Sequence, residues 1–232
     1  MNDLIQGFIQ ALQLIFSLNP ALYDIIWLSL YVTGIALLFS IVVGIPLGAV
    51  MGLKGFPGRR LVMALLYTGM GFPPVVIGLF VYLMFSRSGP IGILGWLFTP
   101  RAMVVAQTII AFPLVAGFTM AAVMGVDANL RRQLLSLGAT EWQTTLAILA
   151  EARIGVVVSI IAGFGSIISE VGAVMLVGGN IEGKTRTLTT AIVLETNKGN
   201  FDLAIALGVV LLLLSFLANL AMIRLQGREL IR

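Results

Sequence analysis

Five long apolar runs without charged residues dominate this sequence. They extend over residues 25–53, 61–86, 102–126, 154–181 and 203–223, and only the fourth is interrupted, at Glu170. About 20 apolar residues are enough to cross a bilayer as a helix. Of the 232 residues, 59% are hydrophobic and 10% are charged, whereas about a quarter of a soluble domain is charged. The sequence therefore predicts an all-α polytopic membrane protein with about five transmembrane helices, in a single domain over residues 1–232.

The amino-terminal segment, residues 4–18, is shorter and carries a polar stripe. Its apolar residues recur on one helical side, whereas Gln6, Gln10 and Gln13 fall on another. We expect an amphipathic helix along the outer membrane interface, with a sixth, tilted span as the alternative. Because no short apolar core follows a basic leader, we expect no cleaved signal peptide.

The basic residues lie mostly at the ends of the apolar runs. A cytoplasmic carboxyl terminus places nine of them inside: Lys54, Arg59, Arg60, Arg131, Arg132, Arg153, Arg224, Arg228 and Arg232. Five then lie outside: Arg87, Arg101, Lys184, Arg186 and Lys198. The positive-inside tendency predicts this orientation, and an odd number of spans places the amino terminus outside. We interpret these charges as orientation signals and expect no nucleic-acid partner.

Several kinds of chemistry are excluded by the residues that the chain lacks. It has no Cys and no His, which excludes disulfides, thiolate metal sites and imidazole bases. It also lacks the phosphate-binding pattern G-x-x-x-x-G-K-[ST]. We therefore expect no catalytic residue, no metal site and no cofactor in this chain.

A predicted cytoplasmic segment, residues 127–153, is too apolar for a plain linker. Leu130, Leu134 and Leu137 recur at helical spacing before Gly138, and Trp142, Leu146 and Leu149 do so after it. This pattern predicts two short helices with a break at the glycine. Such an element can dock into the groove of a soluble partner; a helix lying on the lipid surface is the alternative.

The sequence SLGAT-W, with Ile148 ten residues after Gly138, resembles the cytoplasmic loop of ABC importer permeases. The resemblance covers roughly residues 23–225. It implies that residues 127–153 are the coupling loop, that Arg131 to Thr145 form the coupling helix, and that this helix contacts an ATP-binding subunit. The implied contact residues are Arg131, Arg132, Leu134, Leu137, Gly138, Ala139, Glu141 and Trp142. The chain departs from the family at Arg132-Gln133-Leu134, where Glu-Ala-Ala is usual, and at Ala150-Glu151, where Leu-Pro is expected.

A second stretch, residues 163–190, resembles molybdate, sulfate and especially tungstate permeases. The similar elements are Glu170-Val171-Gly172-Ala173, then Gly179-Asn180-Ile181, and Gly183-Lys184-Thr185. They imply an oxyanion importer, with tungstate first and molybdate or sulfate as alternatives. The implied pathway or gate region comprises Glu170, Gly172, Ala173, Gly179 and Asn180.

Glu170 is the one ionisable residue inside a predicted span, so it must face protein or water. A carboxylate repels a divalent anion, which favours helix bracing over direct contact with the cargo. Lys184 and Arg186 can meet an oxyanion or a binding protein, or be solvated loop cations.

Glycines and prolines inside the predicted spans leave two questions open. Small residues such as Gly34, Gly44, Gly48 and Gly163 can serve plain packing or contacts between subunits. The prolines Pro46, Pro73, Pro74 and Pro113 are expected to kink or break their helices.

By resemblance, the complete importer contains two copies of this permease, two ATP-binding subunits that bind ATP and magnesium, and an extracytoplasmic solute-binding protein. It would lie in a prokaryotic cytoplasmic (inner) membrane, in contact with lipid. The alternatives are an ion-driven secondary carrier, which typically carries internal repeats, and a membrane scaffold without transport.

Overall fold

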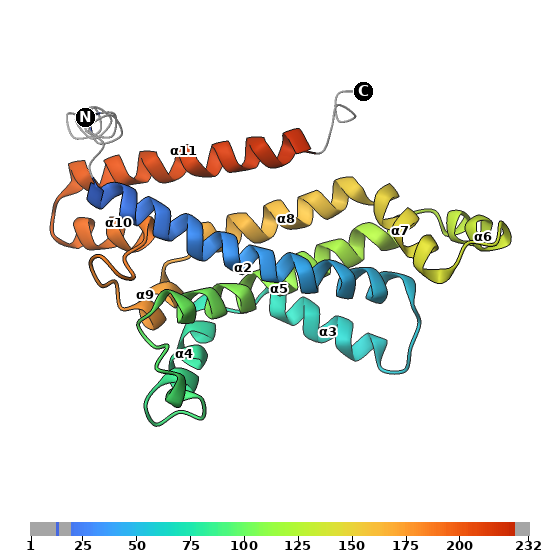
Figure 1. The fold of residues 1–232 in the computed structure, drawn as a ribbon, viewed down its shortest axis with the longest axis horizontal. Helices are drawn as coiled ribbons and strands as arrows, with labels where there is room; N and C mark the ends of the chain where they lie inside the picture. The colour runs from blue at the N-terminus through green and yellow to red at the C-terminus, as the bar shows by residue number, and fades with distance from the viewer. Residues whose placement is uncertain (1–12, 14–19, 226–232) are drawn as a thin grey trace. The chain divides into compact units, whose positions relative to one another are not determined.

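The computed structural model describes residue 13 and residues 20–225, and every regular element in this part of the chain is helical. The α-helices are α2 (Pro20–Leu53), α3 (Arg59–Met70), α4 (Pro74–Phe85), α5 (Pro100–Met124), α6 (Ala128–Ser136), α7 (Glu141–Glu151), α8 (Arg153–Ile168), α9 (Gly172–Gly178), α10 (Leu188–Asn197) and α11 (Phe201–Leu225), with a short 3₁₀ helix, η1 (Gly92–Leu94) (Figure 1). The predicted amphipathic helix over residues 4–18 lies outside the described residues, apart from residue 13.

Three described helices, α2, α5 and α11, are long and apolar enough to cross a membrane. The number rises to five if each of two bent helix pairs, α3 with α4 and α7 with α8, counts as one span. The predicted all-α membrane fold with about five spans is confirmed. Long apolar helices satisfy every backbone polar group internally, which is what the bilayer interior demands.

The predicted second span, residues 61–86, is not one straight helix. Helix α3 ends at Met70 and α4 begins at Pro74, with a break over residues 71–73 between them. Pro73 takes extended backbone angles and Pro74 occupies the first turn of α4, where a missing N–H costs nothing. Pro46 and Pro113, by contrast, lie inside the uninterrupted helices α2 and α5. The expected break therefore occurs only at the proline pair.

The predicted fourth span, residues 154–181, is also divided. Helix α8 ends at Ile168, residues 169–171 are not helical, and α9 then covers seven residues. Glu170 consequently lies in the break rather than inside a spanning helix, which corrects the prediction. Helix α10 was not predicted, because it lies between the fourth and fifth apolar runs.

The chain folds into two compact units. Of the described residues, unit 1 comprises residue 13 and residues 20–36, 73–107 and 165–220, and unit 2 comprises 37–72, 108–164 and 221–225. Among the described residues, unit 2 holds seven Lys or Arg and three Asp or Glu, whereas unit 1 holds five of each.

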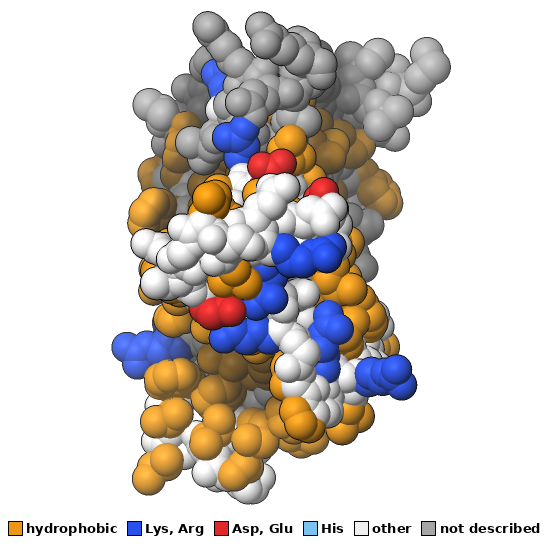
Figure 2. All heavy atoms as spheres, turned by 90° about the vertical axis from the view of Figure 1, so that its right-hand side faces the viewer, with side chains coloured by type: hydrophobic (Ala, Val, Ile, Leu, Met, Phe, Trp, Pro, Cys, Tyr) orange, Lys and Arg blue, Asp and Glu red, His pale blue; other side chains and the backbone are white. Residues whose placement is uncertain are grey.

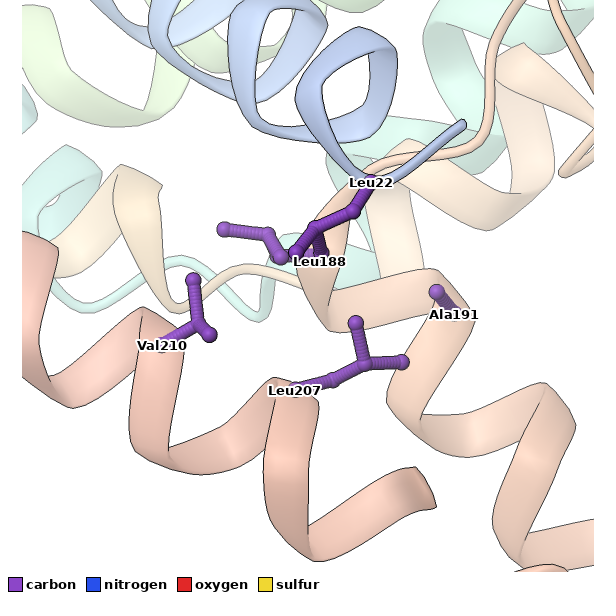
Figure 3. Packing of buried hydrophobic residues seen from close by; sticks show 5 residues of the cluster. All are labelled: Leu22, Leu188, Ala191, Leu207 and Val210. Atoms are coloured by element: carbon purple, nitrogen blue, oxygen red, sulfur yellow. The ribbon is translucent and has the colours of Figure 1, made fainter. Parts of the chain in front are cut away.

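The core of unit 1 joins the start of α2 to helices α10 and α11. Leu22, Leu188, Ala191, Leu207 and Val210 point toward one another there (Figure 3). Helices α4 and α9 also pack together, because Gly78 lacks a side chain: a Cβ at this position would lie 2.6 Å from the Ala173 Cα.

The core of unit 2 depends on close packing of α2 against α5. Gly44, Gly48 and Gly52, spaced by four residues, all face α5. A Cβ at Gly48 would lie 2.9 Å from the Thr119 Cβ, and one at Gly52 would lie 2.8 Å from a Val123 methyl. These glycines therefore serve packing within the chain, which answers the question left open for Gly44 and Gly48.

Candidate functional site

The first candidate site is the hairpin of α6 and α7 in unit 2 (Figure 1). Helix α6 starts at Asp127, whose carboxylate accepts a hydrogen bond from the Asn129 N–H at 2.9 Å. It ends at Ser136, and Gly138, which follows the capping residue Leu137, has a φ of +87°. The N–H groups of Gly138 and Ala139 donate to the Leu135 and Leu134 carbonyls, each at 3.0 Å, which is the usual pattern of a left-handed helix end. The predicted helix break at Gly138 is confirmed.

Helix α7 begins with a capping box. The Gln143 N–H donates to Thr140 Oγ1 at 3.2 Å, and the Thr140 N–H donates to Gln143 Oε1 at 2.8 Å. Further along α7, Ile148 is buried against Ala49 and Val123 from α2 and α5. The hairpin is therefore anchored in the core of unit 2 at one end.

The tip of the hairpin exposes large apolar side chains. Leu137 is 85% exposed and Trp142 is 69% exposed. Arg131 Nη2 donates to both carboxylate oxygens of Glu141, at 3.1 and 3.0 Å, and this ion pair connects the two helices. Because exposed apolar groups beside charged ones are typical of contact surfaces, the tip is suited to a protein partner.

The other predicted coupling residues lie in the same hairpin. Leu134 and Ala139 are half-buried and Arg132 is exposed. Arg132 Nη2 donates to Asn129 Oδ1 at 2.8 Å. Figure 2, which views the molecule from the side of α6 and α7, shows Lys and Arg side chains gathered on this face with few acidic ones.

The second candidate site is the break between α8 and α9 in unit 1. Glu170 Oε1 accepts a hydrogen bond from the Ala173 N–H at 2.9 Å, so its carboxylate caps the start of α9. Gly172 lies against α4, since a Cβ there would be 2.6 Å from a Val75 methyl. The geometry agrees with a bracing role for Glu170.

A strap over residues 179–187 joins α9 to α10. Gly179 and Asn180 both have positive φ, +73° and +50°, and Asn180 Nδ2 donates to the Thr190 carbonyl at 3.4 Å. Thr185 Oγ1 donates to the Gly178 carbonyl at 2.6 Å and accepts from the Ile181 N–H at 2.9 Å. The strap is thus folded back onto the end of α9.

Two residues that sequence reasoning missed hold the break itself. Thr189 Oγ1 donates to the Glu170 carbonyl at 3.0 Å. Gln107 Nε2 donates to the Ile167 carbonyl at 3.0 Å, across 60 residues of sequence. Both side chains are buried and satisfy carbonyls that a continuous helix would have paired. The threonine-rich composition of residues 185–190 was a signal for Thr189, but nothing in the sequence pointed to Gln107.

The predicted outer cations line one pocket in unit 1. Lys184 and Arg186 share a cavity of about 340 Å³ with Asp24, Trp27 and Glu182. Arg186 Nη1 lies 3.3 Å from Glu182 Oε2 and the Arg186 side chain is 18% exposed. Lys184 forms no ion pair within the part of the chain that the structure describes. The two cations are therefore neighbours, but one of them is already paired.

A further cluster of charged and polar side chains lies at the C-terminal end of α10. Glu195 is 8% exposed and accepts hydrogen bonds from Asn200 Nδ2 and Lys198 Nζ, both at 2.8 Å. The Asn200 hydrogen bond, followed by that of Lys198, lowers the pKa of the Glu195 carboxyl below its ordinary value. In the described residues, no group of three acidic side chains is placed to hold a metal ion.

Comparison with known proteins identifies the class. The family described as binding-protein-dependent transport system inner membrane component matches residues 44–229. The match spans well over half of the chain, so this protein belongs to that family of membrane-embedded transport subunits.

Individual relatives match nearly the whole chain. The tungstate uptake system permease TupB of Peptoclostridium acidaminophilum is 39% identical over 97% of this chain and 99% of its own length. A probable anion ABC transporter permease of Haloferax volcanii is 43% identical over 89% of this chain and 91% of its own length. The molybdenum permease ModB of Escherichia coli K12 is 31% identical over 83% and 91%. The resemblance to ABC importer permeases of the oxyanion type is confirmed.

Solved structures show the same fold. A chain of the methionine ABC transporter MetNI, in an inward-facing conformation, superposes with a TM-score of 0.74 at 22% identity, over 91% of this chain and 96% of the other. A chain of a bacterial alginate ABC transporter gives a TM-score of 0.68, also at 22% identity, over 90% and 81%.

Proposed function

We propose that this chain is the membrane-spanning permease subunit of an ATP-driven, binding-protein-dependent importer of an oxyanion, with tungstate as the cargo. The observation that carries the proposal is the match to the tungstate permease of Peptoclostridium acidaminophilum across nearly the full length of both chains. The anion permease of Haloferax volcanii, at higher identity over a shorter stretch, supports the substrate class.

The chain itself performs no catalysis under this proposal. ATP and magnesium are bound by two copies of a separate ATP-binding subunit, which hydrolyse the ATP. An extracytoplasmic solute-binding protein delivers the anion, and a second copy of this chain completes the pathway. The excess of basic residues in unit 2 supports a cytoplasmic position for that unit, with the amino terminus outside and the carboxyl terminus inside.

The hairpin supplies the mechanical connection to the ATP-binding subunit. Leu137 and Trp142 enter a groove of that subunit, and the Arg131–Glu141 pair holds the two helices at a fixed angle. Movement of the hairpin is passed on through Ile148, which packs against α2 and α5. Packed cores transmit such displacements because they are close to incompressible.

The break beside Glu170 is the proposed gate region. Its backbone is irregular and is held by single hydrogen bonds from Thr189 and Gln107. Irregular backbone at membrane depth is tolerated where it is enclosed by protein or lines a water-filled path. The Glu170 carboxylate is engaged by the Ala173 N–H, so it contributes to the shape of this region rather than to anion binding.

The first experiment tests the machine and its cargo together. The permease is reconstituted in proteoliposomes with its ATP-binding subunit and binding protein, and ATPase activity is titrated with tungstate, molybdate and sulfate. Stimulation by tungstate at the lowest concentration is expected. Stimulation at the lowest concentration by molybdate would mean that the chain belongs to an importer but that tungstate is not its cargo; molybdenum is the cargo named for the 31% identical relative. No stimulation by any of the three anions, with the complex intact, would overturn the proposal.

The second experiment tests the docking surface with a matched pair. Trp142 is 69% exposed and Trp27, on α2 in unit 1, is 70% exposed. Burying about 70% of a tryptophan surface of roughly 250 Å² at about 25 cal/mol/Å² corresponds to roughly 4 kcal/mol before the costs of association. We expect Trp142→Ala to weaken co-purification with the ATP-binding subunit by about 30-fold or more, and Trp27→Ala to leave it unchanged. If the two variants weaken co-purification equally, the hairpin does not contact the ATP-binding subunit and this part of the proposal is wrong.

A further inference from the structure

A basic pocket lies at the base of the hairpin, separate from its exposed tip. Its volume is about 460 Å³, and it is formed within unit 2 by the end of α2, the start of α3, the end of α5, the first half of α6 and Ile148 in the second half of α7. Arg59, Arg131 and Arg132 line it, and Asp127 is the single acidic residue in the lining. We refer to it as the arginine pocket.

The positive charge of this pocket is only partly balanced. Arg131 is paired with Glu141, which lies outside the lining. Arg59 and Arg132 form no ion pair with any carboxylate of the described residues. Asp127 is occupied at the start of α6, where its two oxygens accept from the Asn129 N–H at 2.9 Å and from Asn129 Nδ2 at 3.4 Å. Arg59 and Arg132 therefore line one cavity, and neither is paired with a carboxylate of the described residues.

Both unpaired guanidinium groups are held in place. Arg59 Nε donates to the Met51 carbonyl at the end of α2 at 2.9 Å, and Arg59 Nη2 lies 3.7 Å from Met124 Sδ. Arg132 Nη2 donates to Asn129 Oδ1. Each leaves further N–H groups unused, since a guanidinium carries five donors. Arginines fixed in this way lose less entropy when they bind an anion than free side chains do.

We propose that the arginine pocket binds a tetrahedral oxyanion group through Arg59 and Arg132. Guanidinium groups bind such oxyanions through paired, charge-assisted hydrogen bonds. The apolar floor, which includes Val123 and Ile148, strengthens these bonds by lowering the local dielectric. The anion is either a soluble ion, such as phosphate or tungstate, or the phosphate of an anionic lipid head group, because the pocket lies where helices α2 and α5 end.

Occupation of the pocket joins elements that are far apart in sequence. Arg59 belongs to α3 and Arg132 belongs to the hairpin, and an anion between them adds a connection at the base of the proposed coupling element. Arg132 is then assigned to this pocket, whereas the partner contact falls on Leu137 and Trp142. The inference does not depend on transport, because the isolated chain contains every residue of the site.

The test uses the full-length chain in nanodiscs without partner proteins. In one arm, phosphatidylcholine nanodiscs are titrated calorimetrically with sodium phosphate and sodium tungstate. In the other, the chain is exposed to phosphatidylcholine and phosphatidylglycerol, and the retained phosphatidylglycerol is counted by native mass spectrometry. The variants are Arg132→Gln, Arg59→Gln and, as a matched control, Arg60→Gln, which removes the same charge from an exposed position outside the pocket. Thermal unfolding verifies that each variant is folded.

We expect Arg132→Gln and Arg59→Gln to weaken binding by about tenfold or more, with Arg60→Gln unchanged. Loss confined to the titration identifies a soluble oxyanion, and loss confined to retained lipid identifies a head group. Either result supports the pocket. Absence of binding in both arms, binding that survives Arg132→Gln, or equal losses with Arg60→Gln would each overturn the inference.

Discussion

Gly48 is the position where a single methyl group most directly tests the packing of unit 2. An alanine Cβ there would lie 2.9 Å from the Thr119 Cβ and 3.1 Å from the Met120 nitrogen, and closer still to the Ala116 carbonyl oxygen. Thr119 cannot easily move away, because it is fully buried and its hydroxyl lies 3.0 Å from Ser159 Oγ on α8. Helices α2 and α5 must therefore separate.

The expected magnitude follows from two opposing terms. Overpacking of this kind costs about 1–3 kcal/mol, and replacement of a helical glycine by alanine recovers at most about 1 kcal/mol. Gly48→Ala should therefore lower the free energy of unfolding by about 1–2 kcal/mol. The matched control is Gly34→Ala on the same helix, where nothing lies within 4 Å of the added Cβ, and which should be neutral or slightly stabilising.

The measurement is unfolding in mixed micelles by increasing the fraction of denaturing detergent, with helicity as the signal. Gly48→Ala should unfold at a lower fraction than Gly34→Ala. If the two variants unfold together, α2 and α5 are not in close contact at Gly48, and the assignment of the glycine stripe to packing within the chain is wrong.

Three further predictions concern helix ends. Asn200→Ala should raise the pKa of Glu195, because it removes the hydrogen bond that lowers this pKa most. The Glu195 carboxyl stabilises the fold above its ordinary pKa near 4.5, and that contribution disappears as pH falls through the folded pKa. Acid unfolding should therefore begin at a higher pH in the variant than in the unmodified protein. Glu170→Ala should cost about 1 kcal/mol by uncapping the Ala173 N–H, and Glu170→Gln, which retains an acceptor, should cost less, as unfolding midpoints can measure. Gly138→Ala should destabilise the hairpin by about 1 kcal/mol, because φ is +87° there, and should increase amide hydrogen exchange in α6 and α7.

The sequence alone determined the features that depend on near neighbours. The long helices α2, α5 and α11 were predicted from hydropathy, because burial of backbone polar groups in lipid requires long helices wherever apolar residues continue. The two helices of the hairpin and their break were predicted from leucine spacing and from Gly138, since helix ends are formed by residues within a few positions of each other.

Only the tertiary structure decided that the fourth apolar run is broken at Glu170. The fourth run is apolar on both sides of Glu170, so hydropathy favours one span, whereas the break is stabilised by Gln107 from α5 and Thr189 from α10. Whether Gly48 packs within the chain or against a second subunit also depends on which helix lies opposite it. The arginine pocket joins Arg59 to Arg132, 73 positions apart in the sequence. Such contacts are long-range, and local pattern carries no information about which distant side chain completes a hydrogen bond or fills a space.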